Sequence, residues 1–82
     1  MKKGSIFDLP TPVLLLDWPT AKRNIQRAAD FVEDKPVRLR PHFKNHKCVP
    51  LAKQQLAAGG CVGMTTATVE EASVLVESGV ED

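Results

Sequence analysis

Along this chain, short apolar runs alternate with longer stretches of helical periodicity, and this order constrains the fold more than any other feature. Apolar side chains recur at spacings of three and four between residues 19 and 33, which predicts an amphipathic helix. Two further helices are expected over 50–58 and 69–78, and strands over the intervening segments 37–41 and 61–65. Strands that alternate with helices pair in parallel through right-handed crossovers. The pattern therefore predicts an α/β fold with a parallel sheet.

The chain is too short for such a sheet to close on itself. It has 82 residues, whereas a (β/α)8 TIM barrel requires about 250. Two barrel-type units would leave open strand edges and half-covered helices. Aromatic residues, the usual anchors of a small core, make up only 5% of the chain. We therefore expect an incomplete α/β fold, the N-terminal portion of a barrel in a longer protein.

The net charge is close to zero, although the basic residues are unevenly distributed. A formal charge of +1 argues against strong global attraction to nucleic acid or to an acidic membrane. Residues 35–69 carry six basic side chains and no acidic one, which creates a local positive field. A basic nucleic-acid-binding module is one interpretation of this segment, but it has no aromatic residue besides Phe43 and no recognised RNA or DNA motif. We expect no nucleic-acid partner.

The cellular location is inferred from the cysteines and the apolar runs. Cys48 and Cys61 are too few for a disulfide framework, and free thiols in a reducing compartment are expected. The longest apolar run, 13–16, is far shorter than a membrane span. Asp8 follows too soon after the charged start, 1–3, for a signal peptide. We therefore predict a cytoplasmic protein without membrane contact.

A basic cluster of side chains lies where the strand over 37–41 is expected to end. In a strand extended to Lys44, His42 and Lys44 would share one face at a separation of about 7 Å, and Arg40 would lie further away. Parallel α/β proteins place their chemistry at the carboxyl ends of strands. A lysine there binds an anion or forms an imine with a carbonyl, and neighbouring cations favour the neutral amine that an imine requires. Lys44 is therefore the leading candidate, the alternative being an ordinary surface lysine.

Other polar residues near this strand end give less specific signals. His42 and His46 are four residues apart, and Cys48 adds a third potential ligand. In a helix this spacing would bring two ligands together, but in a strand followed by a loop it does not, so no metal site is expected here. Thr65 and Thr66 end the second expected strand. Their hydroxyls are candidates for cofactor contacts, although bonding to nearby backbone groups is their more ordinary role.

A longer motif around Lys44 resembles the signature of a known enzyme group. The run LRPHFKNHK, residues 39–47, resembles the RPHxKxHK signature of the D-threonine aldolase and D-serine dehydratase group. These are pyridoxal-phosphate enzymes with an alanine racemase-like N-terminal barrel. The flanking matches are the TPxLxxD opening at 11–17, the NI pair at 24–25, and the second strand with its ATxxEA helix start at 63–72.

The resemblance implies roles for the candidate residues. Lys44 would hold pyridoxal 5'-phosphate as an internal aldimine and later serve as a base, and His42 would contact the cofactor. Arg40, Thr65 and Thr66 are further candidates for cofactor contacts. The substrate would be a D-amino acid that undergoes aldol cleavage or β-elimination. The choice between aldolase, dehydratase and racemase outcomes stays open, because the groups that decide it lie outside the chain.

The resemblance also implies how the chain fits into a larger protein. Residues 1–17 would form an N-terminal strand segment of a missing β domain, with 13–16 unpaired or paired with another copy. Residues 18–82 would be the first βα units of an alanine racemase-like barrel. The full-length protein would be a homodimer, and any divalent metal would be bound by ligands outside this chain. The isolated chain is expected to be inactive, and a non-catalytic pyridoxal-phosphate-binding barrel protein is the alternative.

Overall fold

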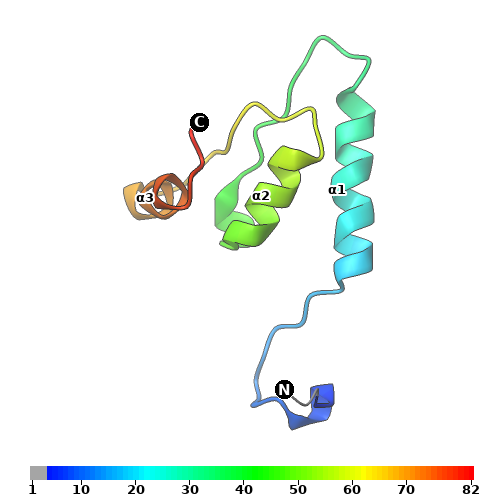
Figure 1. The fold of residues 1–82 in the computed structure, drawn as a ribbon, viewed down its shortest axis with the longest axis vertical. Coiled ribbons are helices and arrows are strands. Elements are labelled where there is room, and N and C mark those ends of the chain that lie inside the picture. Colours follow the sequence, from blue (N-terminus) through cyan, green and yellow to red (C-terminus); the bar gives the residue numbers. More distant parts are fainter. Residues whose placement is uncertain (1–3) are drawn as a thin grey trace.

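The computed structural model describes residues 4–82 as three helices joined by extended segments and short turns (Figure 1). The elements are η1 (Ile6–Asp8), α1 (Trp18–Val32), η2 (Phe43–Asn45), α2 (Val49–Ala57) and α3 (Val69–Glu77), where η denotes a 3-10 turn. Each α-helix begins and ends within one residue of its predicted range, so these predictions are confirmed. Figure 1 shows α2 between α1 and α3. Among residues 4–82, no helix is both long and apolar enough to cross a membrane.

Local capping explains where two of the helices begin. The Asp17 carboxylate accepts the N–H of Thr20 at 3.1 Å, at the start of α1. The Thr68 hydroxyl accepts the N–H of Glu71 at 3.1 Å, at the start of α3. The Glu71 carboxylate in turn accepts the N–H of Ala67 at 3.1 Å, one residue before the cap. These side chains satisfy backbone donors at or just before the helix starts, so both starts are set by local sequence.

The two strands expected between the helices are replaced by isolated parallel bridges. Within the part of the chain that the structure describes, the segments 37–41 and 61–65 form no regular strand, and that prediction is wrong. The pairs that do form are Leu39 with Cys61 and His42 with Thr65. Both bridges are parallel, which confirms the predicted direction of pairing.

Pro41 explains why the pairing is interrupted. Proline has no N–H to donate to a ladder, so a regular strand cannot continue through it on both sides. The bridged residues are three positions apart along the first segment and four positions apart along the second, so the register shifts by one residue between them. The Pro41 carbonyl still accepts the N–H of Thr65 at 2.8 Å, beyond this shift. The segments therefore stay together on both sides of the proline without forming a continuous ladder.

The core lies between α2, α3 and the paired segments, and it includes the residue directly before Lys44. Its buried members are Phe43, Ala52, Met64, Leu75 and Val80, against which Val49 and Leu56 pack. Phe43 is only 2% exposed, although its neighbour Lys44 is exposed. The turn η2 therefore joins a core anchor directly to the candidate lysine.

The N-terminal segment is exposed and extends away from the helices (Figure 1). Leu14 is 98% exposed and Phe7 is 91% exposed, and the segment 13–16 pairs with nothing in the described range 4–82. The expected N-terminal strand is thus not formed within the described residues, and its pairing with a β domain or with another copy stays a prediction. The radius of gyration is 15.0 Å, whereas a compact chain of this length has about 12 Å. Residues 1–3 of the expected segment 1–17 lie outside the described residues.

Candidate functional site

Lys44 lies in the turn η2 and not on an extended strand. This position agrees with the expected loop after residue 41, but the extended geometry considered for His42 and Lys44 is not formed, because the chain turns at Phe43 to bury its ring in the core. His42 and Lys44 are nevertheless brought together. The His42 Nδ1 accepts the backbone N–H of Lys44 at 3.2 Å, which caps the turn. His42 therefore acts on the backbone that carries the lysine, while its own ring is half-buried.

The Lys44 amine is available for chemistry. Its side chain is exposed, and among residues 4–82 its ammonium group has no hydrogen-bond or ion-pair partner. The backbone just before it is fixed, since Phe43 is buried and His42 caps the turn. A free amine on an ordered turn is suited to bind an anion or to react with a carbonyl group.

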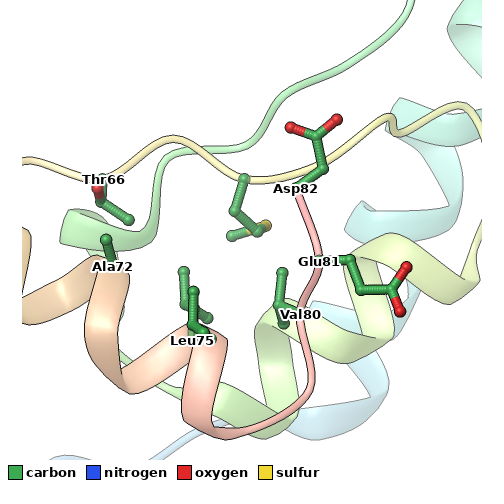
Figure 2. Close-up of a pocket in the computed structure, with 8 residues that line it drawn as sticks. Thr66, Ala72, Leu75, Val80, Glu81 and Asp82 are labelled. Atoms are coloured by element: carbon green, nitrogen blue, oxygen red, sulfur yellow. The ribbon is translucent and has the colours of Figure 1, made fainter.

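Thr65 and Thr66, the two threonine candidates, take different positions. The Thr65 hydroxyl donates to the Arg40 carbonyl at 3.3 Å, and the Thr65 carbonyl accepts the N–H of Phe43 at 2.7 Å. Thr65 thus fixes the segment that leads into η2. Thr66 instead lines a cavity of about 120 Å³ beside α3 that Lys44 and His42 do not line (Figure 2). The structure therefore brings Thr65 to the Lys44 segment and gives Thr66 no described contact with it.

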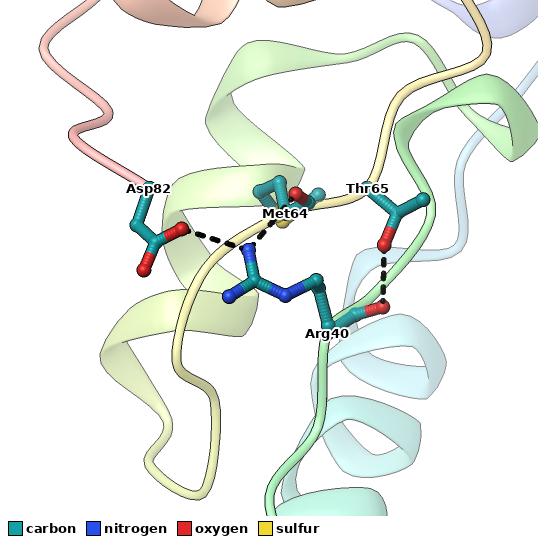
Figure 3. Close-up of polar contacts among 4 residues, drawn as sticks. All are labelled: Arg40, Met64, Thr65 and Asp82. Carbon is teal, nitrogen blue, oxygen red and sulfur yellow. Dashed lines mark hydrogen bonds and ion pairs between the residues drawn. The ribbon is translucent and has the colours of Figure 1, made fainter.

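Arg40 points to the C-terminal end of the described chain. Its guanidinium donates to the Asp82 carboxylate at 2.9 Å and to the Met64 carbonyl at 3.4 Å (Figure 3). The backbone of the same region is also paired, because the Met64 N–H donates to the Asp82 carbonyl at 3.0 Å. A Cβ at Gly63 would lie 2.7 Å from the Arg40 guanidinium and 2.6 Å from the Asp82 backbone, so only glycine leaves room for this contact. Arg40 therefore links the extended segments to one another.

The Arg40–Asp82 pair predicts a modest loss of stability in acid. The hydrogen bond and the charge of Arg40 lower the pKa of the Asp82 carboxyl group and raise the pKa of Arg40. A lowered carboxyl pKa stabilises the fold above the unfolded value of about 3.9, and this stability is lost as the pH falls through the folded value. Asp82→Asn is expected to reduce the fall in unfolding midpoint between pH 7 and pH 2.5, measured by urea denaturation. Glu81→Gln is the matched control, and an equal effect of both variants would contradict the prediction.

His46 and Cys48 are engaged in other contacts. The His46 Nδ1 accepts the N–H of Cys48 at 3.0 Å, and its Nε2 lies 2.9 Å from the Gln55 side-chain oxygen. Both ring nitrogens of His46 are thus used, and no group of three or more His, Cys, Asp or Glu side chains suited to a metal occurs within residues 4–82. Cys48 and Cys61 are free thiols, as predicted, and burial raises the pKa of the Cys61 thiol.

Two residues of this region were not identified from the sequence. Asp82 is 42 residues from Arg40, and no sequence pattern links the two. Gln55 belongs to a helix that was predicted over 50–58, but nothing in the sequence of this helix shows that a polar residue on it faces the turn. Both contacts depend on tertiary packing, which brings distant segments together only after the chain is folded.

Comparison with known proteins identifies the relatives of the chain. A D-threonine aldolase from Filomicrobium marinum is 45% identical, with a TM-score of 0.84 over 92% of this chain. The D-threo-3-hydroxyaspartate dehydratase from Delftia sp. HT23 is 38% identical, with a TM-score of 0.90 over 98% of this chain. This chain is a homologue of the D-threonine aldolases and hydroxyaspartate dehydratases. The resemblance noted around Lys44 is thereby confirmed.

The aldolase and dehydratase homologues are much longer than this chain. It covers 20% of the Filomicrobium aldolase and 21% of the Delftia dehydratase. A third homologue, the 3-hydroxy-D-aspartate aldolase of Paracoccus denitrificans, is 36% identical over 75 residues, which is 19% of its length. No protein-family model matches the chain. The chain thus spans about a fifth of these lyases, each named for a D-configured hydroxy amino acid.

Proposed function

We propose that this chain is part of a pyridoxal-phosphate-dependent lyase that acts on D-amino acids bearing a 3-hydroxyl group. The observation that carries the proposal is the Lys44 amine, exposed and without a partner in the described residues, on a turn fixed by Phe43 and His42. The names of the homologues support aldol cleavage or β-elimination as the reaction. Both reactions act at the carbon next to the hydroxyl-bearing carbon of such a substrate.

The residues present fit the covalent attachment of the cofactor. When bound, the cofactor supplies an aldehyde for the lysine and a ring that withdraws electrons from the substrate. Lys44 would hold it, and the free Nζ of Lys44 would afterwards accept or donate a proton. His42 would lie beside it with a fixed tautomer, because its Nδ1 accepts the Lys44 N–H and its Nε2 must therefore carry the hydrogen. Its Nε2–H is a donor for a cofactor or substrate oxygen.

Thr65 and Arg40 would support this site from behind. Thr65 fixes the segment before Lys44 through its hydroxyl and its carbonyl, so its effect on the cofactor is exerted through the backbone. Arg40 is already paired with Asp82. In this arrangement it would order the paired segments next to the site and would not bind a phosphate. Thr66 stays a candidate for a cofactor contact from the segment that follows Thr65.

The larger architecture belongs to the same proposal. Residues 18–82 would be the first βα units of an alanine racemase-like barrel, and 1–17 would pack with a β domain. The TM-scores of 0.84 and 0.90 support this placement, as does the greater length of the homologues. We propose that the full-length protein is a cytoplasmic homodimer, in which parts outside residues 1–82 bind the phosphate group of the cofactor. A metal is also proposed for those parts, since one structure of a D-threo-3-hydroxyaspartate dehydratase mutant is described as a metal-free form.

The proposal is tested by assaying the full-length protein with D-threonine, L-threonine and D-threo-3-hydroxyaspartate. Aldol cleavage of D-threonine breaks the Cα–Cβ bond and releases glycine and acetaldehyde, whereas elimination from hydroxyaspartate releases ammonia and a 2-oxo acid. We expect turnover of at least one D-substrate and none of L-threonine. Bound cofactor without turnover of any substrate would favour the non-catalytic alternative, and absence of both would refute the proposal.

A further inference from the structure

The tautomer of His46 is determined by its two neighbours. The Cys48 backbone N–H can only donate, so the His46 Nδ1 that it contacts at 3.0 Å must be an acceptor. The hydrogen of the neutral ring is then on Nε2, which donates to the Gln55 side-chain oxygen at 2.9 Å. All three groups are at least half-buried, so water competes little for these bonds. The Cys48 N–H therefore selects this tautomer, and Gln55 stabilises it by accepting the Nε2–H.

These bonds fix the far end of the turn that carries Lys44. His46 also packs edge-on against the Phe43 ring, with centroids 5.7 Å apart and planes at 85°. Lys47 completes the turn, because its N–H donates to the Phe43 carbonyl at 2.8 Å. Its φ of +50 is a left-handed conformation, which costs energy in a residue with a side chain. A turn with such a residue needs support on both sides. His42 provides it before Lys44, and His46 provides it after.

We propose that Gln55 is a positioning residue for Lys44: from α2, and through His46, it anchors the turn 42–48 in the form that presents the lysine amine. The inference rests on the proposed function, in which Lys44 binds the cofactor. Gln55 itself makes no hydrogen bond to Lys44. Its effect is exerted through one side chain and one backbone bond, so the effect of its loss is limited to that of about one hydrogen bond.

The test compares three variants of the full-length protein. Gln55→Met keeps the length and the helix propensity of the side chain but removes the acceptor oxygen. Gln55→Glu restores an acceptor at the same place. Gln54→Met is the control for the same change on the exposed side of α2. Two quantities are measured for each: amide hydrogen exchange of the peptide 43–48, and the equilibrium amount of pyridoxal 5'-phosphate fixed on Lys44 by borohydride.

We expect Gln55→Met to accelerate exchange in 43–48 and to lower the fixed amount about five-fold at sub-saturating cofactor. Gln55→Glu should restore both quantities, and Gln54→Met should change neither. Unchanged exchange in Gln55→Met, or faster exchange with unchanged fixation on Lys44, would overturn the inference. If the parent protein fixes no cofactor on Lys44, the proposed function fails, and the exchange result alone then decides whether Gln55 anchors the turn.

Discussion

Replacement of Lys44 by alanine in the full-length protein is expected to abolish borohydride-fixed pyridoxal phosphate at this position. Turnover should fall by at least about a thousand-fold, as it does when other covalent nucleophiles are removed. The reason is that Lys44 is the first lysine of the signature, the position that the resemblance assigns to the cofactor, and its exposed amine lies on a turn anchored on both sides. The measurement is peptide mapping after reduction, together with the absorbance of the bound cofactor.

Lys47→Ala is the matched control for this experiment. Lys47 lies on the same turn and is exposed. Alanine also has a Cβ, so the cost of the left-handed backbone conformation at this position stays about the same and the turn is not further strained. We expect this variant to retain the label on Lys44. If the label were found on Lys47 or Lys53 while Lys44 was unmodified, the assignment of the signature would be wrong.

Phe43→Ala is expected to destabilise the fold by about 3–5 kcal/mol. Phe43 is 2% exposed and packs with Ala52, Met64, Leu75 and Val80, so its removal leaves a cavity where α2, α3 and the paired segments meet. A loss of this size is a large part of the stability of a small domain. The measurement is urea unfolding followed by the helical circular-dichroism signal.

Phe7→Ala provides the same chemical change at an exposed position. In the 82-residue chain, without the β domain that 1–17 is proposed to contact, Phe7 is 91% exposed, and its replacement there is expected to change the free energy of unfolding by no more than about 0.5 kcal/mol. Equal unfolding midpoints for the two variants would show that Phe43 is not the anchor of this core.

The helices could be predicted because their signals are local. The apolar periodicity of 19–33 and the caps at Asp17 and Thr68 act within one or two turns, and the structure reproduces each boundary within one residue. The strands could not be predicted as well, because strand formation depends on partners elsewhere. Pro41 lies between the two bridged residues, Leu39 and His42, and its missing N–H matters only once the register with 61–65 is known.

The candidate site was predictable in part for the same reason. Lys44 and His42 were found from a contiguous motif, although their contact is made in a turn instead of along a strand face. Their strand geometry was wrong because the burial of Phe43 outweighs the extended conformation. The Arg40–Asp82 pair and the Gln55–His46 bond join residues 42 and 9 positions apart, and only the folded backbone determines which of many polar residues meet.

The register shift at Pro41 makes segment length a constraint in its own right. The extra residue between Cys61 and Thr65 sets the phase of the second segment, so that Thr65 faces the chain just before Lys44. Deletion of one residue there would turn the threonine to the opposite side and remove both of its bonds to residues 40 and 43. Substitutions between these two positions leave the phase intact, whereas any change in their number resets it. The number of residues between the two bridges is therefore a constraint of its own, separate from the identity of those residues, such as the glycine required at 63.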